Sequence, residues 1–222
     1  MPSDTALNTA LNTAPVALKR LGLVDYEEAW QIQRQFHMEV AEGARPNTLL
    51  LVEHPPIFTA GRRTLDNERP IDGSKVIDVD RGGKITFHGP GQIVGYPIVK
   101  LRDSFDVIGF VRELENSLIE VCKEFGILAE RYCERSGVWI RDSKGDRKIA
   151  AIGIRVARGV TMHGFALNVD PDLSFYEKIV PCGIADAGVT SFANELGQSP
   201  AVEDVLPVLE RHIYEALAKV SL

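Results

Sequence analysis

The sequence predicts an α+β protein that folds as one domain around a mixed or antiparallel sheet. Three observations carry this prediction: strand-like apolar segments recur, short loops join several of them, and amphipathic helices lie between and after them. The loops Asp142–Asp146 and Ala157–Gly159 have the length of hairpin connections, which join antiparallel strands. No linker divides residues 15–222, whereas residues 1–14 contain the repeat ALNTALNTA without a bulky core residue. We therefore expect a single domain over 15–222 and a flexible N-terminal arm over 1–14.

Capping residues predict where two of the helices begin and end. Asp25 and Glu28 are spaced as in a capping box, and Gly43 should stop the helix that follows them. Asp106 should cap a second, strongly amphipathic helix, which Gly126 closes.

The strands and the last helix follow from hydrophobic patterning. The continuous apolar run Leu49–Val52 predicts a strand that is covered on both faces. A last helix should cover roughly Val202–Lys219, although Pro207 near its first turn leaves its starting residue open. The other expected strands are KVIDV, the apolar parts of Arg81–Ile98, ILAERY, GVWIR, KIAAIGIRV and VTMHGFALNV.

Composition excludes several classes of protein. The formal net charge of −6 gives no electrostatic reason to expect nucleic acid as a partner. No run of eighteen apolar residues could span a membrane, and the N-terminus lacks the pattern of a secretory signal. Three cysteines without regular spacing indicate reduced thiols rather than a disulfide frame, so we expect a cytoplasmic protein.

The segment Arg81–Ile98 is the most unusual part of the sequence. It reads RGGKITFHGPGQIVGYPI, so apolar strand residues are interrupted by Gly-Gly and Gly-Pro-Gly. Glycine allows positive φ and close approach of the backbone to another group, at about 1 kcal/mol of lost stability per interior site. Such a density of glycine indicates the wall of a pocket, and two hairpins with glycine turns are the alternative.

Cys182 is the candidate nucleophile. It stands between Pro181 and Gly183, where the glycine leaves the thiol uncrowded and backbone N–H groups could face an oxyanion. A loop cysteine without a role is the alternative. Cys122 should be a buried and inert thiol on the second helix, and Cys133 is given no role.

Lys148 is the candidate partner of that thiol. An unperturbed thiol pKa of ~8.5 leaves a few per cent thiolate at pH 7, and lowering the pKa by about 2 units corresponds to roughly 2.7 kcal/mol. A nearby ammonium can supply this stabilisation. Lys148 opens a strand that Ala150, Ala151 and Gly153 make slim, as if a substrate chain lay along it. A solvated charge at a sheet edge is the alternative.

Two histidines precede glycine and could take part in the chemistry. His88 and His163 could each act as a base for Cys182, or could hold loops through side-chain hydrogen bonds. His54 should orient the loop before Pro-Pro, and His37 and His212 should be surface or boundary residues. The sequence contains no P-loop, no G-x-G-x-x-G between strand and helix, no H-E-x-x-H and no C-x-x-C, so we expect neither a nucleotide motif nor a metal site.

Four motifs, in this order and spacing, resemble the lipoyl(octanoyl) transferases of lipoate biosynthesis: RGGKITFHGPGQIVGYPI, RKIAAIGIR, HGFALNV and PCGI. The resemblance runs from about residue 20 to the final helix and leaves the N-terminal arm outside. Phe87 stands where many relatives have tyrosine, which costs a hydroxyl and leaves the assignment intact. The resemblance implies the fold of the biotin/lipoate protein ligase catalytic domain, a mixed, mostly antiparallel sheet flanked by helices.

The same resemblance implies a mechanism and partners. Cys182 would take an octanoyl or lipoyl group from acyl carrier protein as a thioester, and Lys148 would lower the pKa of the thiol and handle protons. The acceptor would be a lysine of a lipoyl domain, as in 2-oxoacid dehydrogenases or the glycine cleavage H protein. A thioester is already activated, so no cofactor is expected. The implied substrate-contacting residues are Arg81, Gly82, Gly83, Lys84, Ile85, Thr86, Phe87, His88, Ala151, Ile152, Gly153, Gly164, Phe165 and Ala166.

Three other functions remain open from the sequence. An ATP-dependent lipoate or biotin ligase on the same fold would form an adenylate and need no cysteine. A Cys-His hydrolase would use His163 and release free octanoate. An acyl-binding scaffold without catalysis would form no covalent adduct.

Overall fold

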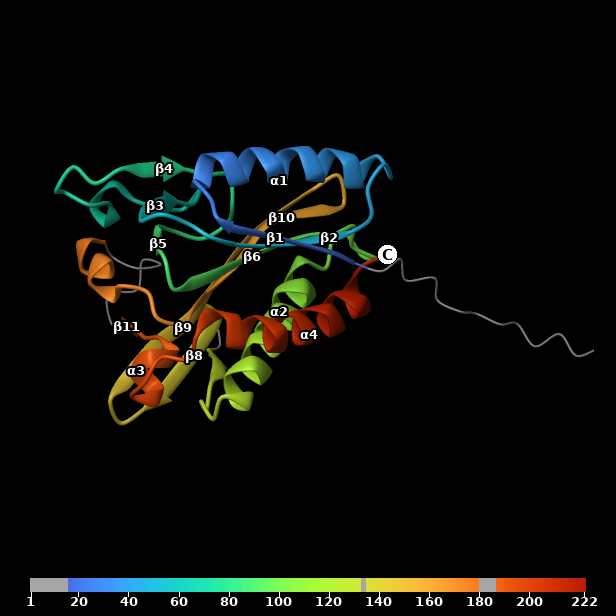
Figure 1. The fold of residues 1–222 in the computed structure, drawn as a ribbon. Helices are drawn as coiled ribbons and strands as arrows, with labels where there is room; N and C mark the ends of the chain where they lie inside the picture. The colour runs from blue at the N-terminus through green and yellow to red at the C-terminus, as the bar shows by residue number, and fades with distance from the viewer. Residues whose placement is uncertain (1–15, 133–134, 180–186) are drawn as a thin grey trace, which may run out of the picture.

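A computed structural model describes residues 16–132, 135–179 and 187–222. The predicted arm over 1–14, Cys133 and Cys182 lie outside the described residues. The predicted α+β fold is confirmed: helices flank a large mixed sheet in which antiparallel pairs predominate, and a small three-stranded sheet lies beside it (Figure 1).

The main sheet has the order β1-β2-β6-β10-β9-β8-β7, with β11 also pairing with β9. The pairs β1/β2 and β11/β9 are parallel, and the other pairs are antiparallel. The strands of this sheet are β1 (Ala17–Leu23), β2 (Thr48–Glu53), β6 (Gln92–Ile98), β7 (Glu130–Tyr132), β8 (Arg135–Asp142), β9 (Gly145–Ala157), β10 (Val160–Asn168) and β11 (Gly188–Val189). The small sheet consists of β4 (Val76–Asp78), β3 (Ile57–Ala60) and β5 (Thr86–His88), in that order.

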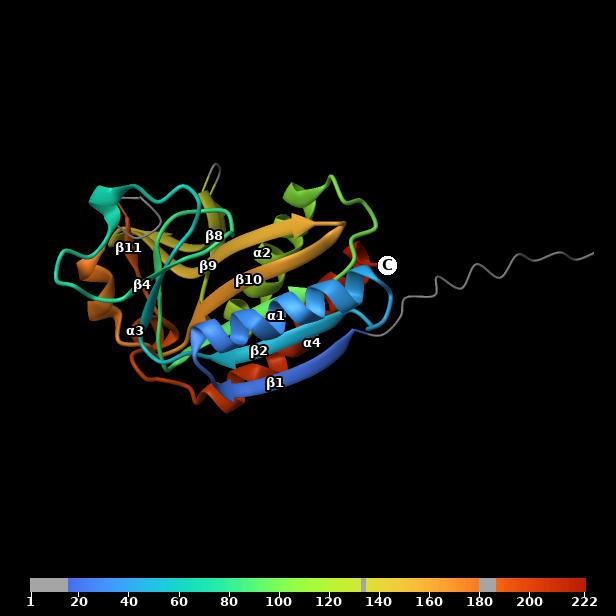
Figure 2. The same ribbon diagram turned by 90° about the horizontal axis from the view of Figure 1, so that it is seen from above.

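The long helices cover opposite faces of the main sheet. Helix α1 (Tyr26–Ala41) lies on one face, and α2 (Val107–Glu124) and α4 (Val202–Val220) pack together on the other, as Figures 1 and 2 show. The remaining short elements are the 3-10 helices η1 (Asp66–Glu68) and η2 (Leu173–Lys178) and the helix α3 (Phe192–Leu196).

Strand β2 shows how the two faces are filled. Leu49 and Leu51 belong to the core cluster under α2 and α4, whereas Leu50 and Val52 belong to the cluster under α1. The prediction that Leu49–Val52 is covered on both faces is therefore confirmed.

The helix boundaries are close to those predicted. Asp25 caps α1 through the backbone N–H of Glu27, one residue earlier than a capping box would use. Asp106 caps α2 through the N–H of Gly109. Helix α4 begins at Val202 and runs through Pro207, which costs the helix one backbone hydrogen bond.

Strands β1, β3 and β11 were not predicted from the sequence. Strand β1 is an edge strand whose residues are mostly exposed, so it has little of the alternation of a half-buried strand. Strand β3 has only four residues and lies between Pro56 and a polar loop.

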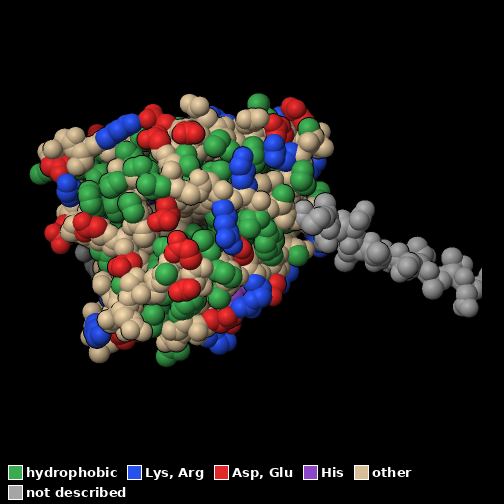
Figure 3. Space-filling view, in the orientation of Figure 1, with side chains coloured by type: hydrophobic (Ala, Val, Ile, Leu, Met, Phe, Trp, Pro, Cys, Tyr) green, Lys and Arg blue, Asp and Glu red, His purple; other side chains and the backbone are tan. Residues whose placement is uncertain are grey.

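The distribution of charged side chains on the surface agrees with the expectation from the formal net charge. Figure 3 shows acidic and basic side chains interspersed on the visible face, without a continuous basic patch. Within the described ranges, no helix is both long and apolar enough to cross a membrane.

Candidate active site

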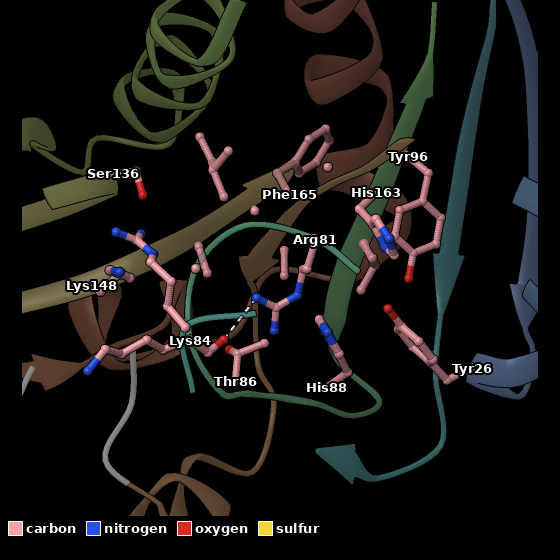
Figure 4. Close-up of a pocket in the computed structure, with 18 of the residues that line it drawn as sticks. Tyr26, Arg81, Lys84, Thr86, His88, Tyr96, Ser136, Lys148, His163 and Phe165 are labelled. Carbon is pink, nitrogen blue, oxygen red and sulfur yellow. Dashed lines mark hydrogen bonds between the residues drawn. The ribbon is translucent and has the colours of Figure 1, made fainter. Parts of the chain in front are cut away.

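A pocket of about 220 Å³ lies on the face of the main sheet that carries α1. Its floor comes from β6, β9 and β10, and a wall comes from the segment 81–88, which leads into β5. Figure 4 shows Lys148 and Ser136 at one end of the pocket, Tyr26, Tyr96 and His163 at the other, and Arg81 between them. The glycine-rich stretch therefore does form part of a pocket wall, as the sequence predicted.

Two rows of small or apolar residues cross the floor. Ala166 on β10 pairs with Val94 on β6 and with Ala151 on β9. Two residues farther along, Gly164 pairs with Gly153. A Cβ atom on Gly153 would lie 3.0 Å from both the Cδ atom of Arg81 and the carbonyl oxygen of Gly82, so glycine lets the wall approach the floor.

The wall is fixed by the side chain of Arg81. Its guanidinium donates hydrogen bonds to the carbonyl oxygens of Gly82 (3.0 Å), Lys84 (2.8 Å) and Thr59 (2.8 Å). The N–H of Gly82 in turn donates to the carbonyl of Ile154 on β9 at 2.9 Å. The guanidinium thus holds the Gly-Gly turn against the sheet.

Most of the implied substrate-contacting residues do line this pocket, and three do not. The lining residues among them are Arg81, Gly83, Lys84, Thr86, His88, Ala151, Ile152, Gly153, Gly164, Phe165 and Ala166. Ile85 and Phe87 alternate with Thr86 and His88 and join a separate buried cluster with Phe58 and Tyr176. Gly82 supports the wall through its N–H and carbonyl groups.

A β-bulge turns Lys148 toward the pocket. Trp139 on β8 pairs with Lys148, but its neighbour Val138 pairs with Ala150, so β9 holds one extra residue at this point. Ile149 and Ala150 both belong to the core cluster under α2 and α4, whereas Lys148 and Ala151 both line the pocket. Without the bulge, strict alternation would place Lys148 and Ala151 on opposite faces.

The ammonium of Lys148 lies against an aromatic ring. Its Nζ atom is 4.6 Å from the centre of the Trp139 ring, a cation–π contact. Gly137 makes room for the lysine: its φ is +111°, and a Cβ atom there would lie 2.5 Å from the Ala150 carbonyl and 3.4 Å from the Lys148 Cε atom. The N–H of Gly137 donates to the buried carboxylate of Glu115 on α2 at 3.0 Å, which fixes this turn of β8.

His163 lies at the end of the pocket far from Lys148. It pairs with Ile154 on β9, six residues beyond Lys148 with the bulge between them, which corresponds to about 17 Å along the strand. Its Nε2 atom donates to Asp80 at 2.7 Å, and burial lowers the pKa of the ring. A thiol that lies within hydrogen-bond reach of Lys148 could not also use His163 as a base.

His88 is held by hydrogen bonds inside the protein. Its Nδ1 atom is 2.7 Å from the Gln92 amide oxygen, and its Nε2 atom is 3.2 Å from the Thr59 hydroxyl. Burial lowers the pKa of His88 to about 3, and the neighbouring His54 and Arg81 act in the same direction. These contacts fit the alternative in which His88 holds loops together.

A buried aromatic group closes the pocket beside His88. His54 bonds the Val24 carbonyl through Nδ1 (2.7 Å) and the Tyr96 hydroxyl through Nε2 (2.8 Å). The Tyr26 ring stacks on His88 with 5.7 Å between ring centres. Burial raises the pKa of Tyr26 to about 12 and raises that of Tyr96 as well, so both hydroxyls stay protonated.

Of the three cysteines, the structure describes Cys122. It is fully buried in the core cluster under α2 and α4, and burial raises the pKa of its thiol to about 12. The expectation of an inert thiol is therefore confirmed. No group of three or more His, Cys, Asp or Glu side chains in the described ranges could hold a metal ion.

Comparison with known proteins identifies the family. Residues 25–214 match the model of the lipoyl protein ligase A/B catalytic domain. The chain belongs to this family. A protein from Salinispora arenicola named octanoyltransferase is 58% identical over 203 residues, which cover 90% of this chain and 95% of that protein. One of the same name from Mycolicibacterium gilvum is 56% identical, with 92% of this chain and 87% of that protein covered.

Solved structures of the ligase branch share the fold at low sequence identity. The bipartite lipoate protein ligase of Thermoplasma acidophilum superposes with a TM-score of 0.71 at 15% identity, covering 91% of this chain and 84% of that one. A lipoate-protein ligase A bound with ATP gives a TM-score of 0.70 at 14% identity, covering 91% and 85%. The biotin protein ligase of Aquifex aeolicus gives 0.54 at 14% identity, covering 91% and 71%. The expected ligase-like fold is thereby confirmed.

Several residues of this family site were missed in the sequence. Trp139 meets Lys148 across the hairpin, and counting back from the turn, where Asp142 pairs with Gly145, could have paired the two residues because the bulge lies beyond them. Tyr26 follows the cap of α1 directly, and nothing in the local pattern shows that it faces a pocket. Tyr96 was identified as a strand residue of the glycine-rich stretch but not as part of the site. Other lining residues missed are Arg63, Val94, Arg135 and Ser136.

Proposed function

We propose that this chain is an octanoyltransferase of lipoate biosynthesis that forms a thioester on Cys182. The donor is octanoyl- or lipoyl-acyl carrier protein. The acceptor is a lysine of an apo lipoyl domain, such as those of 2-oxoacid dehydrogenases and the glycine cleavage H protein. One observation carries the proposal: a bulge places the Lys148 ammonium at one end of a pocket whose adjoining floor is slim and apolar. Relatives named octanoyltransferase, 50–58% identical, support it.

The reaction runs in two half-reactions. In the first, the Cys182 thiolate attacks the carbonyl carbon of the donor thioester, the bond to the carrier sulfur breaks, and Lys148 gives that sulfur a proton. In the second, the neutral amine of the acceptor lysine attacks the Cys182 thioester and forms the amide. The amine proton passes to Lys148, and the thiolate is restored.

The chain that follows Cys182 returns to Lys148, which supports their pairing. Val189 pairs with Lys148 in parallel register, and the N–H of Thr190 donates to the Lys148 carbonyl at 2.9 Å. Gly188 is six residues after Cys182, a separation that a chain can span over at most about 20 Å. The described chain on the C-terminal side of Cys182 therefore runs beside Lys148.

Intact-mass analysis tests the proposed function. Incubation with octanoyl-acyl carrier protein should give one octanoyl adduct, which maps to Cys182 and is discharged by an apo lipoyl domain. Cys182→Ala should give none, while Cys122→Ala serves as the matched control because that thiol is buried. An adduct on Cys122 or Cys133 would contradict the site, and free octanoate as the main product would favour a hydrolase.

An ATP-dependent ligase is the second candidate function, because a ligase bound with ATP shares this fold. It predicts that Cys182→Ala keeps full activity with ATP and free octanoate. Wild-type protein that needs the thioester donor and ignores ATP would exclude it.

A further inference from the structure

The floor of the pocket changes from apolar to polar along its length. Beside Lys148, the first row of the floor consists of Ala151, Ala166 and Val94. The far end carries the hydroxyls of Tyr26 and Tyr96 together with His163, as Figure 4 shows. An acyl chain that starts at Lys148 therefore meets methyl groups first and polar groups afterwards.

Hydrogen bonds at the far end leave acceptors facing the pocket. The Val24 carbonyl can only accept, so Nδ1 of His54 carries the proton and Nε2 accepts from the Tyr96 hydroxyl. Figure 4 shows the Tyr26 hydroxyl facing that of Tyr96 at this end of the pocket. Nε2 of His163 donates to Asp80. Water can supply hydrogen-bond partners to the Tyr26 hydroxyl and to the remaining lone pair of Tyr96.

The length of an octanoyl chain matches the apolar part. Seven carbon–carbon bonds of about 1.5 Å at tetrahedral angles give an extended octanoyl group of about 9 Å. The bulge takes up one of the three residues between Lys148 and Ala151, so Ala151 lies about 7 Å along β9 from Lys148 and Gly153 about 13 Å. The last methyl of an octanoyl group ends near the first row, whereas four more carbons would bring it close to the second.

We propose that Tyr26 and Tyr96 set the upper limit of acyl length in this enzyme. A chain of about eight carbons leaves the polar end hydrated. A longer chain displaces that water, and the Tyr26 hydroxyl and the remaining lone pair of Tyr96 then lose their hydrogen-bond partners, which is unfavourable for buried polar groups. This proposal rests on the proposed function, because acyl length is measured from a thioester held at Lys148.

A series of donors tests the limit in the unmodified protein. Hexanoyl, octanoyl, decanoyl, dodecanoyl and tetradecanoyl groups are loaded on acyl carrier protein, and kcat/KM for transfer to an apo lipoyl domain is measured for each. We expect kcat/KM to fall at least tenfold between octanoyl and dodecanoyl. Transfer of dodecanoyl within twofold of octanoyl would overturn the proposal.

Variants then test the residues. Tyr26→Phe/Tyr96→Phe makes the far end apolar at nearly constant volume, and it should raise the ratio of dodecanoyl to octanoyl kcat/KM at least tenfold. Tyr26→Phe alone keeps the bond between Tyr96 and His54 and should raise the ratio about threefold if the double variant does not fold. Tyr214→Phe, on α4 outside the pocket, is the control and should leave the ratio unchanged.

The outcomes separate this proposal from the proposed function. No transfer of any acyl group would refute the function itself. Octanoyl transfer with an unchanged length preference in both tyrosine variants would refute only the role of the hydroxyls.

Discussion

The two ends of the pocket share one floor but differ in their polar side chains, which are an ammonium at one end and neutral histidine rings at the other. At one end, the Lys148 ammonium lies on the face of Trp139 in a gap that Gly137 leaves open. At the other, burial lowers the pKa values of His54, His88 and His163, so their rings are neutral near pH 7. Lys148 is 7% exposed and His88 is 6% exposed, so exposure alone does not distinguish them. The two side chains differ in their contacts: Lys148 lies on the Trp139 ring, whereas His88 bonds to Gln92 and Thr59.

Under the proposed function, proton transfer belongs to the Lys148 end of the pocket and acyl binding to the other. Removing Lys148 should therefore have the largest effect on the reaction. Lys148→Ala should slow formation of the Cys182 adduct by about 10³-fold, within the 10²–10⁴-fold range of general acid–base groups. Lys148→Arg should fare little better, because a guanidinium cannot give up its proton at neutral pH.

The measurement is the rate of adduct formation by intact mass. Lys144→Ala, in the exposed turn between β8 and β9, is the matched control and should react like the wild type. Near-normal transfer by Lys148→Ala would remove the catalytic role of the lysine and the contrast between the two ends.

The neutral state of His88 at the far end should affect how the free energy of unfolding depends on pH. The pKa of His88 is about 3 in the folded protein and ~6.5 when unfolded, so the unfolded chain binds more protons between these values. The contribution of His88 to the free energy of unfolding is fully present above pH 6.5 and is lost as the pH falls toward 3. At pH 4 the loss is at most about 3 kcal/mol, at 1.36 kcal/mol per pKa unit.

Denaturant unfolding from pH 7 to pH 4 checks this expectation. His88→Gln should lose less stability over that range than the wild type, because its amide does not titrate. Tyr214→Phe, on α4 outside the pocket, removes a hydroxyl that does not titrate in this range and should follow the wild type. Parallel pH curves for His88→Gln and wild type would mean that His88 is not held neutral.

A third prediction tests the gap that admits Lys148. Gly137→Ala should slow adduct formation about 10- to 100-fold, because its Cβ would lie 2.5 Å from the Ala150 carbonyl and displace the bulged strand. Gly145→Ala is the matched control: its φ of +98° carries a comparable backbone strain of roughly 1–2 kcal/mol, but nothing lies within 4 Å of the new Cβ. Equal rates in the two variants would show that backbone strain, and not the approach to Lys148, sets the effect.

How much of this site follows from the sequence depends on the kind of contact. Helix caps such as Asp106 and the doubly covered strand at Leu49–Val52 are local patterns, and both were predicted correctly. The glycine-rich wall was predicted because glycine density reports close approach. The bulge at Ile149 was not, because KIAAIGIR is a continuous apolar run in which an extra residue leaves no trace. Tyr26 and Tyr96 meet across 70 positions of sequence, which no local pattern encodes.

The partner of Lys148 offers the finest test of the comparison, because it was found only through the register of β8 and β9. Trp139→Leu should slow adduct formation about three- to tenfold, since a cation–π contact contributes about 0.5–2 kcal/mol. Trp139→Phe also loses volume but keeps a ring face, so it should recover most of the rate at saturating donor. If the two variants were equally slow, the indole would act by packing alone. If Trp139→Phe recovers the rate and Trp139→Leu does not, the aromatic face holds the Lys148 ammonium at the place where the thioester forms.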